Sequence, residues 1–285
     1  MGLLKKYLED VLDLSSRHDI PFAEKCRLLG GFLFLKFQLR QKNSVRFLNS
    51  TVSFSSRTNG LGILREIFLL GDYAFKPSSP APRILDVGAN IGIATLFFKR
   101  YFPEADITAF EAMPENFKVL QENISQNKLQ KTQAVLGFLG KEDGTRDVYY
   151  NPVRPGGSTG VEAVAASKSE KQTFKKVQVP AFKLSDYLNE EIDLLKMDVE
   201  GAEGEILKEV HTSQKLRRIK EMVFEYHANR TNKENDLCDI LKILEANNYS
   251  VVIYDNENGA FGKALKPFPI YHFMVRAFRR EPLAA

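Results

Sequence analysis

The sequence predicts a doubly wound α/β domain with a mostly parallel sheet, preceded by an N-terminal helical extension. From residue 83 onward, short apolar runs of strand length alternate with helical segments, the pattern of consecutive βαβ units. Hydrophobic residues make up 44% of the 285 residues and charged residues 27%, which is typical of a globular protein with a sizeable core. The first strand of the series runs into a glycine-containing turn, and ligands in such sheets bind at the carboxyl ends of the strands.

The extension comes first along the chain. We expect two helices, an extended segment and a third helix before the sheet begins, at residues 3–42, 45–55 and 60–72. Three prolines between residues 77 and 82 break this pattern and predict a linker. We therefore divide the chain into an N-terminal helical cap with its linker (1–80) and an α/β domain (81–285). The apolar stretch 28–39 is too short to span a bilayer, and we favour a helix packed on the core over peripheral membrane contact.

The α/β domain is expected to contain nine extended segments and four helices. The extended segments are expected at residues 83–87, 105–110, 134–138, 147–150, 175–179, 192–197, 221–224, 250–255 and 273–278. The helices are expected at residues 93–102, 114–127, 203–210 and 232–247. Polar stretches between these elements, at residues 151–160, 167–176 and 256–268, are expected to surround the substrate.

Charge and cysteine content exclude several classes of function. The formal net charge of +4 is too small to predict a nucleic-acid partner without a clustered basic surface. The two cysteines are far apart, so we expect no disulfide and a reducing, cytoplasmic location. The four histidines are scattered, and no metal site is predicted from their spacing.

The turn after the first strand reads Asp-Val-Gly-Ala-Asn-Ile-Gly from Asp86 to Gly92. It is not a dinucleotide fingerprint, because Asn90 stands where that motif needs its second glycine, and it lacks the Gly-Lys-Ser/Thr of a P-loop. We interpret it as a turn in which Gly88 permits close approach to a bulky ligand and Asp86 holds a cationic amino group. Glu111 ends the second strand, where an acid commonly accepts hydrogen bonds from ribose hydroxyls.

Ionisable residues gather at the ends of the next two strands. Period-two alternation places Lys196, Asp198 and Glu200 on one side of the chain. Glu225 and His227 end the following strand, so they reach the same edge of the sheet. Such a cluster is unfavourable unless it is paired or functional. A structural ion pair is the alternative interpretation of the first three residues.

These motifs together resemble the FkbM family of methyltransferases. The resemblance rests on residues 86–92, on Phe-Glu at 110–111, and on Leu-Lys-Met-Asp-Val-Glu-Gly-Ala-Glu at 195–203. It implies a Rossmann-like class I fold with a seven-stranded sheet that binds S-adenosyl-L-methionine (SAM). It also implies O-methylation, and acceptors in this family include sugars, polyketides and carboxylates.

The resemblance assigns roles to individual residues. The SAM loop would be formed by Asp86, Gly88, Ala89, Asn90 and Gly92. Glu111 would hold the ribose, Asp198 would lie near the methionine moiety and the methyl group, and Tyr73 would cover the site. Phe138, after the third strand, is a candidate to pack on the adenine, although a core role is equally consistent with its position.

We expect methyl transfer to a hydroxyl on a small-molecule, glycan or natural-product acceptor, with a general base to remove its proton. The candidates are Asp198, Glu200, Glu225 and His227, of which His227 has the most suitable unperturbed pKa. Lys196 is expected to orient a carboxylate. A divalent metal held by the acids is not supported by the spacing.

Other classes of function remain as alternatives. A carboxylate acceptor and a non-catalytic SAM-binding scaffold stay open. A base-amino methyltransferase is disfavoured because Asp-Val-Glu-Gly replaces the Asn/Asp-Pro-Pro-aromatic element of that class. A cysteine-nucleophile RNA methyltransferase is disfavoured because neither Cys26 nor Cys238 is placed at the active edge.

Overall fold

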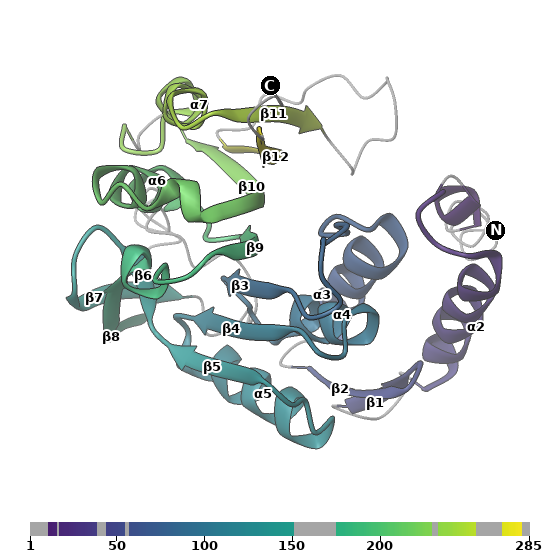
Figure 1. Ribbon diagram of the computed structural model, residues 1–285. Helices are drawn as coiled ribbons and strands as arrows, with labels where there is room; N and C mark the ends of the chain where they lie inside the picture. Colours follow the sequence, from purple (N-terminus) through teal and green to yellow (C-terminus); the bar gives the residue numbers. More distant parts are fainter. Residues whose placement is uncertain are drawn as a thin grey trace.

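A seven-stranded sheet forms the centre of the computed structural model, which describes residues 11–15, 17–38, 44–54, 57–150, 175–229, 233–254 and 270–280. Its strands are β3 (Arg83–Val87), β4 (Asp106–Glu111), β5 (Thr132–Leu136), β9 (Ile192–Met197), β10 (Ile219–Asn229), β11 (Tyr249–Tyr254) and β12 (Ile270–Arg279). Their order across the sheet is β11-β12-β10-β9-β3-β4-β5 (Figure 1). The five strands from β10 to β5 are parallel, and β12 runs antiparallel between β10 and β11. The predicted fold class is therefore confirmed.

Helices cover both faces of this sheet, as Figure 1 shows. The main ones are α4 (Ile93–Tyr101), α5 (Pro114–Gln126), α6 (Glu203–Thr212) and α7 (Leu237–Ala246), with short 3₁₀ helices η4 (Leu184–Tyr187) and η5 (Leu216–Arg218). Alternate strand residues enter different cores: Ile84 and Leu194 pack on the α4 side, whereas Leu85 and Leu195 pack on the α6 and α7 side. This period-two pattern explains why the buried strands are almost continuously apolar.

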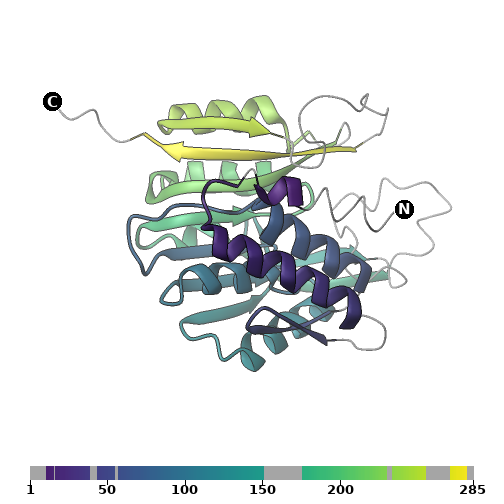
Figure 2. The same cartoon turned by 90° about the vertical axis from the view of Figure 1, so that its right-hand side faces the viewer.

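The N-terminal region packs on the α4 side and contains α2 (Phe22–Gln38), β1 (Ser44–Phe47), β2 (Ser50–Ser53), α3 (Arg57–Leu64) and η1 (Arg65–Leu70). Figure 2 shows α2 as the outermost layer of that side. The expected extended segment is a hairpin of β1 and β2. The expected third helix is α-helical only to Leu64 and continues as the π-helix η1.

Aromatic rings join this region to the sheet domain. Phe32, Phe47, Phe68 and Phe97 contact one another edge to face in sequence, with ring centroids 4.9, 5.1 and 5.3 Å apart. Such pairs add packing energy beyond the burial of their area. The helical cap therefore shares one hydrophobic core with the α4 face of the sheet.

A second sheet of three strands, in the order β6-β8-β7, lies beside the carboxyl end of β5. It consists of β6 (Phe138–Gly140), β7 (Gly144–Tyr150) and β8 (Lys175–Lys183). The strands expected at residues 147–150 and 175–179 pair antiparallel here and do not extend the main sheet. β8 lies between the other two strands and pairs parallel with β6 and antiparallel with β7, so these three strands interrupt the βαβ pattern of the main sheet.

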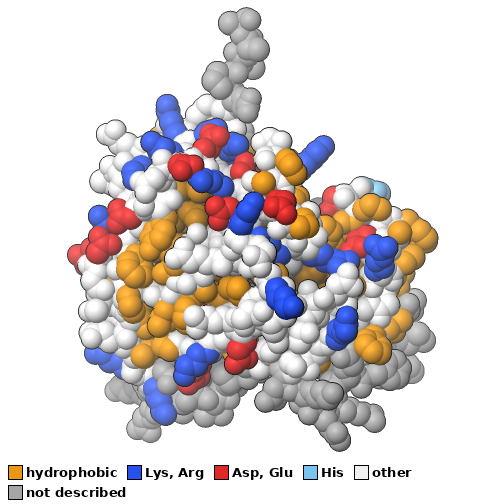
Figure 3. Space-filling view, turned by 60° about the horizontal axis from the view of Figure 1, so that its bottom comes forward, with side chains coloured by type: hydrophobic (Ala, Val, Ile, Leu, Met, Phe, Trp, Pro, Cys, Tyr) orange, Lys and Arg blue, Asp and Glu red, His pale blue; other side chains and the backbone are white. Residues whose placement is uncertain are grey.

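The surface carries charges of both signs. On the face in Figure 3, Lys and Arg side chains lie among Asp and Glu side chains. Phe22 and Phe34 are 81% and 57% exposed on α2. Within the described ranges, no helix combines the length and the apolar character needed to cross a membrane. The polar stretches 151–160 and 256–268, and residues 167–174 of the third, lie outside the described residues.

Candidate functional site

The turn after β3 packs directly against the turn after β9. Gly88 has φ of 72°, and a Cβ atom on it would lie 1.8 Å from the carbonyl oxygen of Asp198. Glycine is therefore required here by the protein's own backbone, and close approach to a bulky ligand stays a prediction. The contact joins the two motifs that the sequence predicts to cooperate.

Glu111 is a buried carboxylate at the end of β4, with 7% exposure. Its Oε2 accepts a hydrogen bond from Asn90 N and its Oε1 one from Met113 N, both at 2.8 Å. Burial raises the pKa of Glu111 to about 7, against these hydrogen bonds, which lower it. A carboxylate has about four acceptor positions, so each oxygen keeps capacity for a ligand donor.

Asp86 is fully buried behind the turn. One of its oxygens accepts from Thr95 Oγ1 at 2.7 Å, and the other lies 3.2 Å from Lys196 Nζ. Lys196 Nζ also donates to Gly88 O at 2.7 Å. Asp86 Oδ2 is thus taken by Thr95, whereas Oδ1 lies beside Lys196 and accepts no hydrogen bond from the described residues. The contact of Asp86 with a ligand amino group stays a prediction.

Two adjoining cavities lie at the carboxyl ends of the strands, and Gly88 and Asp198 line both of them. The first cavity is also lined by Tyr73, Ala89, Asn90, Lys196 and Glu225, and the second by Glu111, Phe138 and Glu200. The fold therefore brings together most of the predicted site residues, from β3, β4, β9, β10 and the segment before β3. Gly92 lies behind them as the N-cap of α4.

Tyr73 enters the first cavity from the end of the N-terminal region. It is 6% exposed, and its ring centroid lies 5.1 Å from Lys196 Nζ. Arg276 of β12 holds the backbone on either side of it, because its guanidinium donates to Asp72 O and Ala74 O at 3.1 and 2.5 Å. A part of the N-terminal region is thereby fixed at the edge of the cavity.

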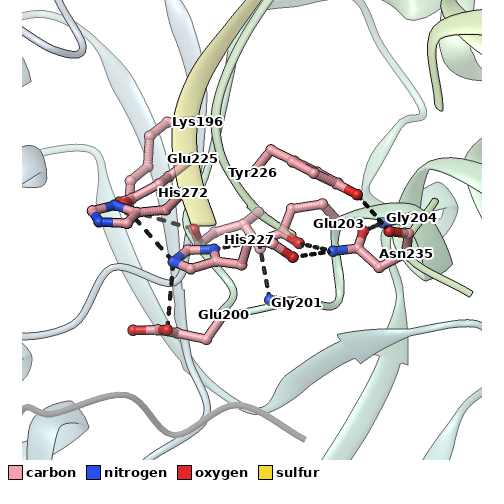
Figure 4. A network of polar contacts seen from close by, with 11 residues as sticks. Lys196, Glu200, Gly201, Glu203, Gly204, Glu225, Tyr226, His227, Asn235 and His272 are labelled. Carbon is pink, nitrogen blue, oxygen red and sulfur yellow. Dashed lines mark hydrogen bonds and ion pairs between the residues drawn. The ribbon is translucent and has the colours of Figure 1, made fainter. Parts of the chain in front are cut away.

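Carboxylates surround His227 at the end of β10, as Figure 4 shows. His227 Nε2 lies 3.4 Å from Glu200 Oε2 and 3.8 Å from Glu225 Oε1. The Asp198 carboxylate makes no hydrogen bond or ion pair with any of the described residues. Burial, together with the charge of Glu225, raises the pKa of Asp198 to about 6, and burial raises the pKa of Glu200 to about 7.

Glu225 and His227 are shifted toward their charged forms. Burial alone would raise the pKa of Glu225, but the hydrogen bond from His272 brings that pKa below its usual value. Burial opposes the charge on His227, but the hydrogen bond to Glu203 and the nearby carboxylates hold its pKa well above its usual range. An imidazolium has no lone pair for a proton, which argues against the expectation that His227 is the general base.

Three residues of this network have no role in the sequence-based prediction: Glu203, Asn235 and His272. Glu203 is fully buried, its Oε1 accepts from His227 Nδ1 at 3.0 Å, and its Oε2 accepts from Asn235 Nδ2 at 2.9 Å (Figure 4). Asn235 Nδ2 also donates to His227 O at 2.9 Å. From the sequence alone, Glu203 is explained as an acidic residue that stabilises the first turn of α6. No sequence pattern indicates that Asn235 or His272 lies near His227.

Comparison with known proteins identifies relatives of the chain. Residues 86–251 match the family profile described as the methyltransferase FkbM domain. "Methyltransferase 1" of Beauveria bassiana (strain ARSEF 2860) is 35% identical over 162 residues, covering 51% of this chain and 65% of that protein. "Methyltransferase sdnD" of Sordaria araneosa is 39% identical over 177 residues, covering 52% and 68%. The chain thus spans about two thirds of the length of these relatives, slightly less for the first.

A more distant relative has a named reaction. "31-O-demethyl-FK506 methyltransferase FkbM" of Streptomyces tacrolimicus is 25% identical over 198 residues, covering 61% of this chain and 74% of that protein. Among solved structures, methyltransferase FkbM from Methylobacillus flagellatus KT aligns with 96% of this chain and 58% of its own, at 11% identity and a TM-score of 0.49. That structural likeness is too weak to add to the relationship of the sequences.

Proposed function

Because the chain belongs to the FkbM methyltransferase family, we propose that it transfers the methyl group of SAM to a hydroxyl group of a small-molecule, glycan or natural-product acceptor. The observation that carries this proposal is the buried carboxylate of Glu111 in the wall of a cavity that adjoins the acidic cluster. An acid that is buried with spare acceptor capacity fits a ligand that supplies hydroxyl donors.

We assign the adenosine half of SAM to the second cavity. Glu111 would accept hydrogen bonds from the ribose hydroxyls, and Phe138 would pack on the adenine. Asp198 lines both cavities and would lie at the methionine end. Bound SAM supplies a methyl group on a sulfonium centre, and carboxylates near that centre favour its positive charge.

The first cavity would then take the acceptor. Tyr73 and Lys196 line one part of it, and Asp198 and Glu225 another. Asp198 is our proposed base, because its carboxylate is unpaired among the described residues and borders both cavities. The name of the Streptomyces relative refers to methylation at an oxygen, which supports a hydroxyl acceptor.

A carboxylate acceptor is the second candidate within the family, and the charge of the site disfavours it. Asp198, Glu200 and Glu225 lie near one another, whereas Lys196 is occupied by Asp86. An anionic acceptor would meet like charges at short range, which is unfavourable in a partly buried site. A neutral hydroxyl avoids that repulsion.

The proposal is tested by measuring S-adenosylhomocysteine formed when the full chain is incubated with SAM and a panel of hydroxyl compounds. Each compound is paired with its methyl ether and with the matching carboxylate. We expect product with at least one hydroxyl compound and none with its methyl ether. Product from carboxylates alone, or none from a panel spanning sugars, polyketides and phenols while SAM binds, would overturn the proposal of hydroxyl methylation.

A further inference from the structure

The turn after β9 and the end of β10 bring three metal-ligating side chains together. One donor atom each from Asp198, Glu200 and His227 lies within 4.8 Å of the others. Two donors bound at about 2.1 Å to one ion are roughly 3 Å apart when adjacent and roughly 4.2 Å apart when opposite. The separation of 3.4 Å between His227 Nε2 and Glu200 Oε2 is close to the first value, so these two side chains could bind one ion with little adjustment, and Asp198 would complete the set by a side-chain movement.

His227 is oriented as a ligand would be. Its Nδ1 contacts Glu203, a fully buried carboxylate that also accepts from Gly201 N and Asn235 Nδ2. This arrangement makes Nδ1 the donor and directs Nε2 toward Asp198 and Glu200. Histidine ligands of metals are commonly held in this way by a carboxylate behind the ring. Glu203 is therefore a positioning residue for His227.

The negative charges around His227 can be balanced by a proton on its ring or by a bound cation. The carboxylates of Asp198, Glu200 and Glu225 face this place, and the Asp198 carboxylate has no hydrogen-bond or ion-pair partner in the described part of the chain. Lys196 does not balance them, since it pairs with Asp86 and donates to Gly88 O. His272 contacts Glu225 from β12 (Figure 4). A proton on Nε2 and a divalent cation would compete for the place between the carboxylates.

We propose that Asp198, Glu200 and His227 bind a divalent first-row transition-metal ion beside the acceptor cavity. The donor set of two carboxylates and one imidazole suits Mn²⁺, Fe²⁺ or Zn²⁺ better than Ca²⁺ or Mg²⁺, which favour oxygen ligands alone. The ion would hold the acceptor oxygen, and the second oxygen of Asp198 would stay available for the acceptor proton. This role rests on the proposed function, whereas ion binding itself does not.

The test is a titration of the full chain with Mn²⁺ in the absence of SAM, followed by electron paramagnetic resonance of the free ion. Wild type should bind one Mn²⁺ per chain. Glu200→Gln and Asp198→Asn should each weaken binding at least about tenfold. Glu122→Gln, an exposed acid on α5, is the matched control and should bind as wild type does. Thermal unfolding of each variant confirms that it is folded.

Calorimetry of SAM binding on the same samples separates the two proposals. Wild type that binds SAM but no Mn²⁺ up to millimolar concentration would overturn the metal site and leave the proposed function intact. Unchanged Mn²⁺ affinity in both ligand variants would also overturn it. Mn²⁺ binding in a chain that does not bind SAM would support the metal site and count against the proposed function.

Discussion

At the scale of single residues, burial opposes the charge that the proposed role of Glu111 requires. Its carboxylate accepts two backbone hydrogen bonds, yet burial still raises its pKa to about 7. A charged group in that position is unfavourable for the free protein and becomes favourable when ligand hydroxyls donate to it. Residues with perturbed pKa values occur often at binding sites, where a ligand can stabilise a charge that burial disfavours.

The raised pKa of Glu111 predicts how SAM binding depends on pH. The ribose hydroxyls need the ionised carboxylate, so a proton must leave Glu111 before SAM binds at low pH. With a pKa of about 7, the association constant should be about tenfold lower at pH 6 than at pH 8. Calorimetry of Glu111→Gln over the same pH range is the control, because the part of the pH dependence that comes from Glu111 should disappear.

Gly88 predicts a large loss of stability on substitution. In Gly88→Ala the new Cβ would meet Asp198 O at 1.8 Å, and the backbone has positive φ. We expect a loss of at least about 3 kcal/mol in the free energy of unfolding, measured with urea. Gly30→Ala on α2 is the control, since a Cβ there meets nothing within 4 Å. It should stabilise the protein by up to about 1 kcal/mol; equal effects of the two substitutions would contradict this account of the turn.

At the scale of elements, the sequence predicted which residues lie at the ends of the strands, but it did not predict which side chains contact one another there. Lys196, Asp198, Glu225 and His227 follow from the βαβ pattern, because parallel strands end at one edge of the sheet. The second sheet did not follow, because antiparallel pairing of β7 with β8 depends on contacts between distant segments. Glu203 could not be assigned either, since it lies on α6 whereas its partner His227 lies on β10.

The ion pair between α2 and α4 predicts how firmly the cap is attached. Glu24 Oε1 accepts from Arg100 Nε and Nη2 at 2.9 and 2.7 Å, and both side chains are less than one-fifth exposed. Glu24→Ala should lower the free energy of unfolding by about 1–3 kcal/mol. Glu104→Ala breaks the exposed pair with Lys131 and should change it by less than about 1 kcal/mol. Comparable losses in urea denaturation would show that burial does not distinguish these pairs.

At the scale of the whole molecule, the N-terminal region contributes to the site through η1 and Tyr73. Leu28, Phe47 and Phe68 share their core with the α4 face, so the predicted division at residue 80 separates sequence patterns and not hydrophobic cores. We propose that the residues before 80 shape the first cavity, where the acceptor would bind, and do not affect SAM binding in the second cavity. Ile67 and Tyr73 line only the first of the two cavities.

Arg17 offers a test of that proposal without deleting core residues. Its Nη1 donates to Leu69 O near the end of η1, and its side chain is 12% exposed. Arg17→Ala should speed amide hydrogen exchange over residues 66–73 and leave SAM affinity within about twofold of wild type. Arg27→Ala, whose side chain is 70% exposed, should change neither quantity. A fall in SAM affinity in a folded Arg17→Ala variant would show that the cap also affects the cavity assigned to SAM.

The most direct test of the central claim is calorimetric titration of SAM into the full chain and into Glu111→Gln. Hydrogen bonds to a charged group contribute about 1.5–3 kcal/mol. We therefore predict one SAM per wild-type chain and roughly 10–150-fold weaker binding to the folded variant. Glu115→Gln on α5 should bind as wild type does. No SAM binding by wild type, or equal affinity in Glu111→Gln, would contradict the assignment of this cavity to SAM.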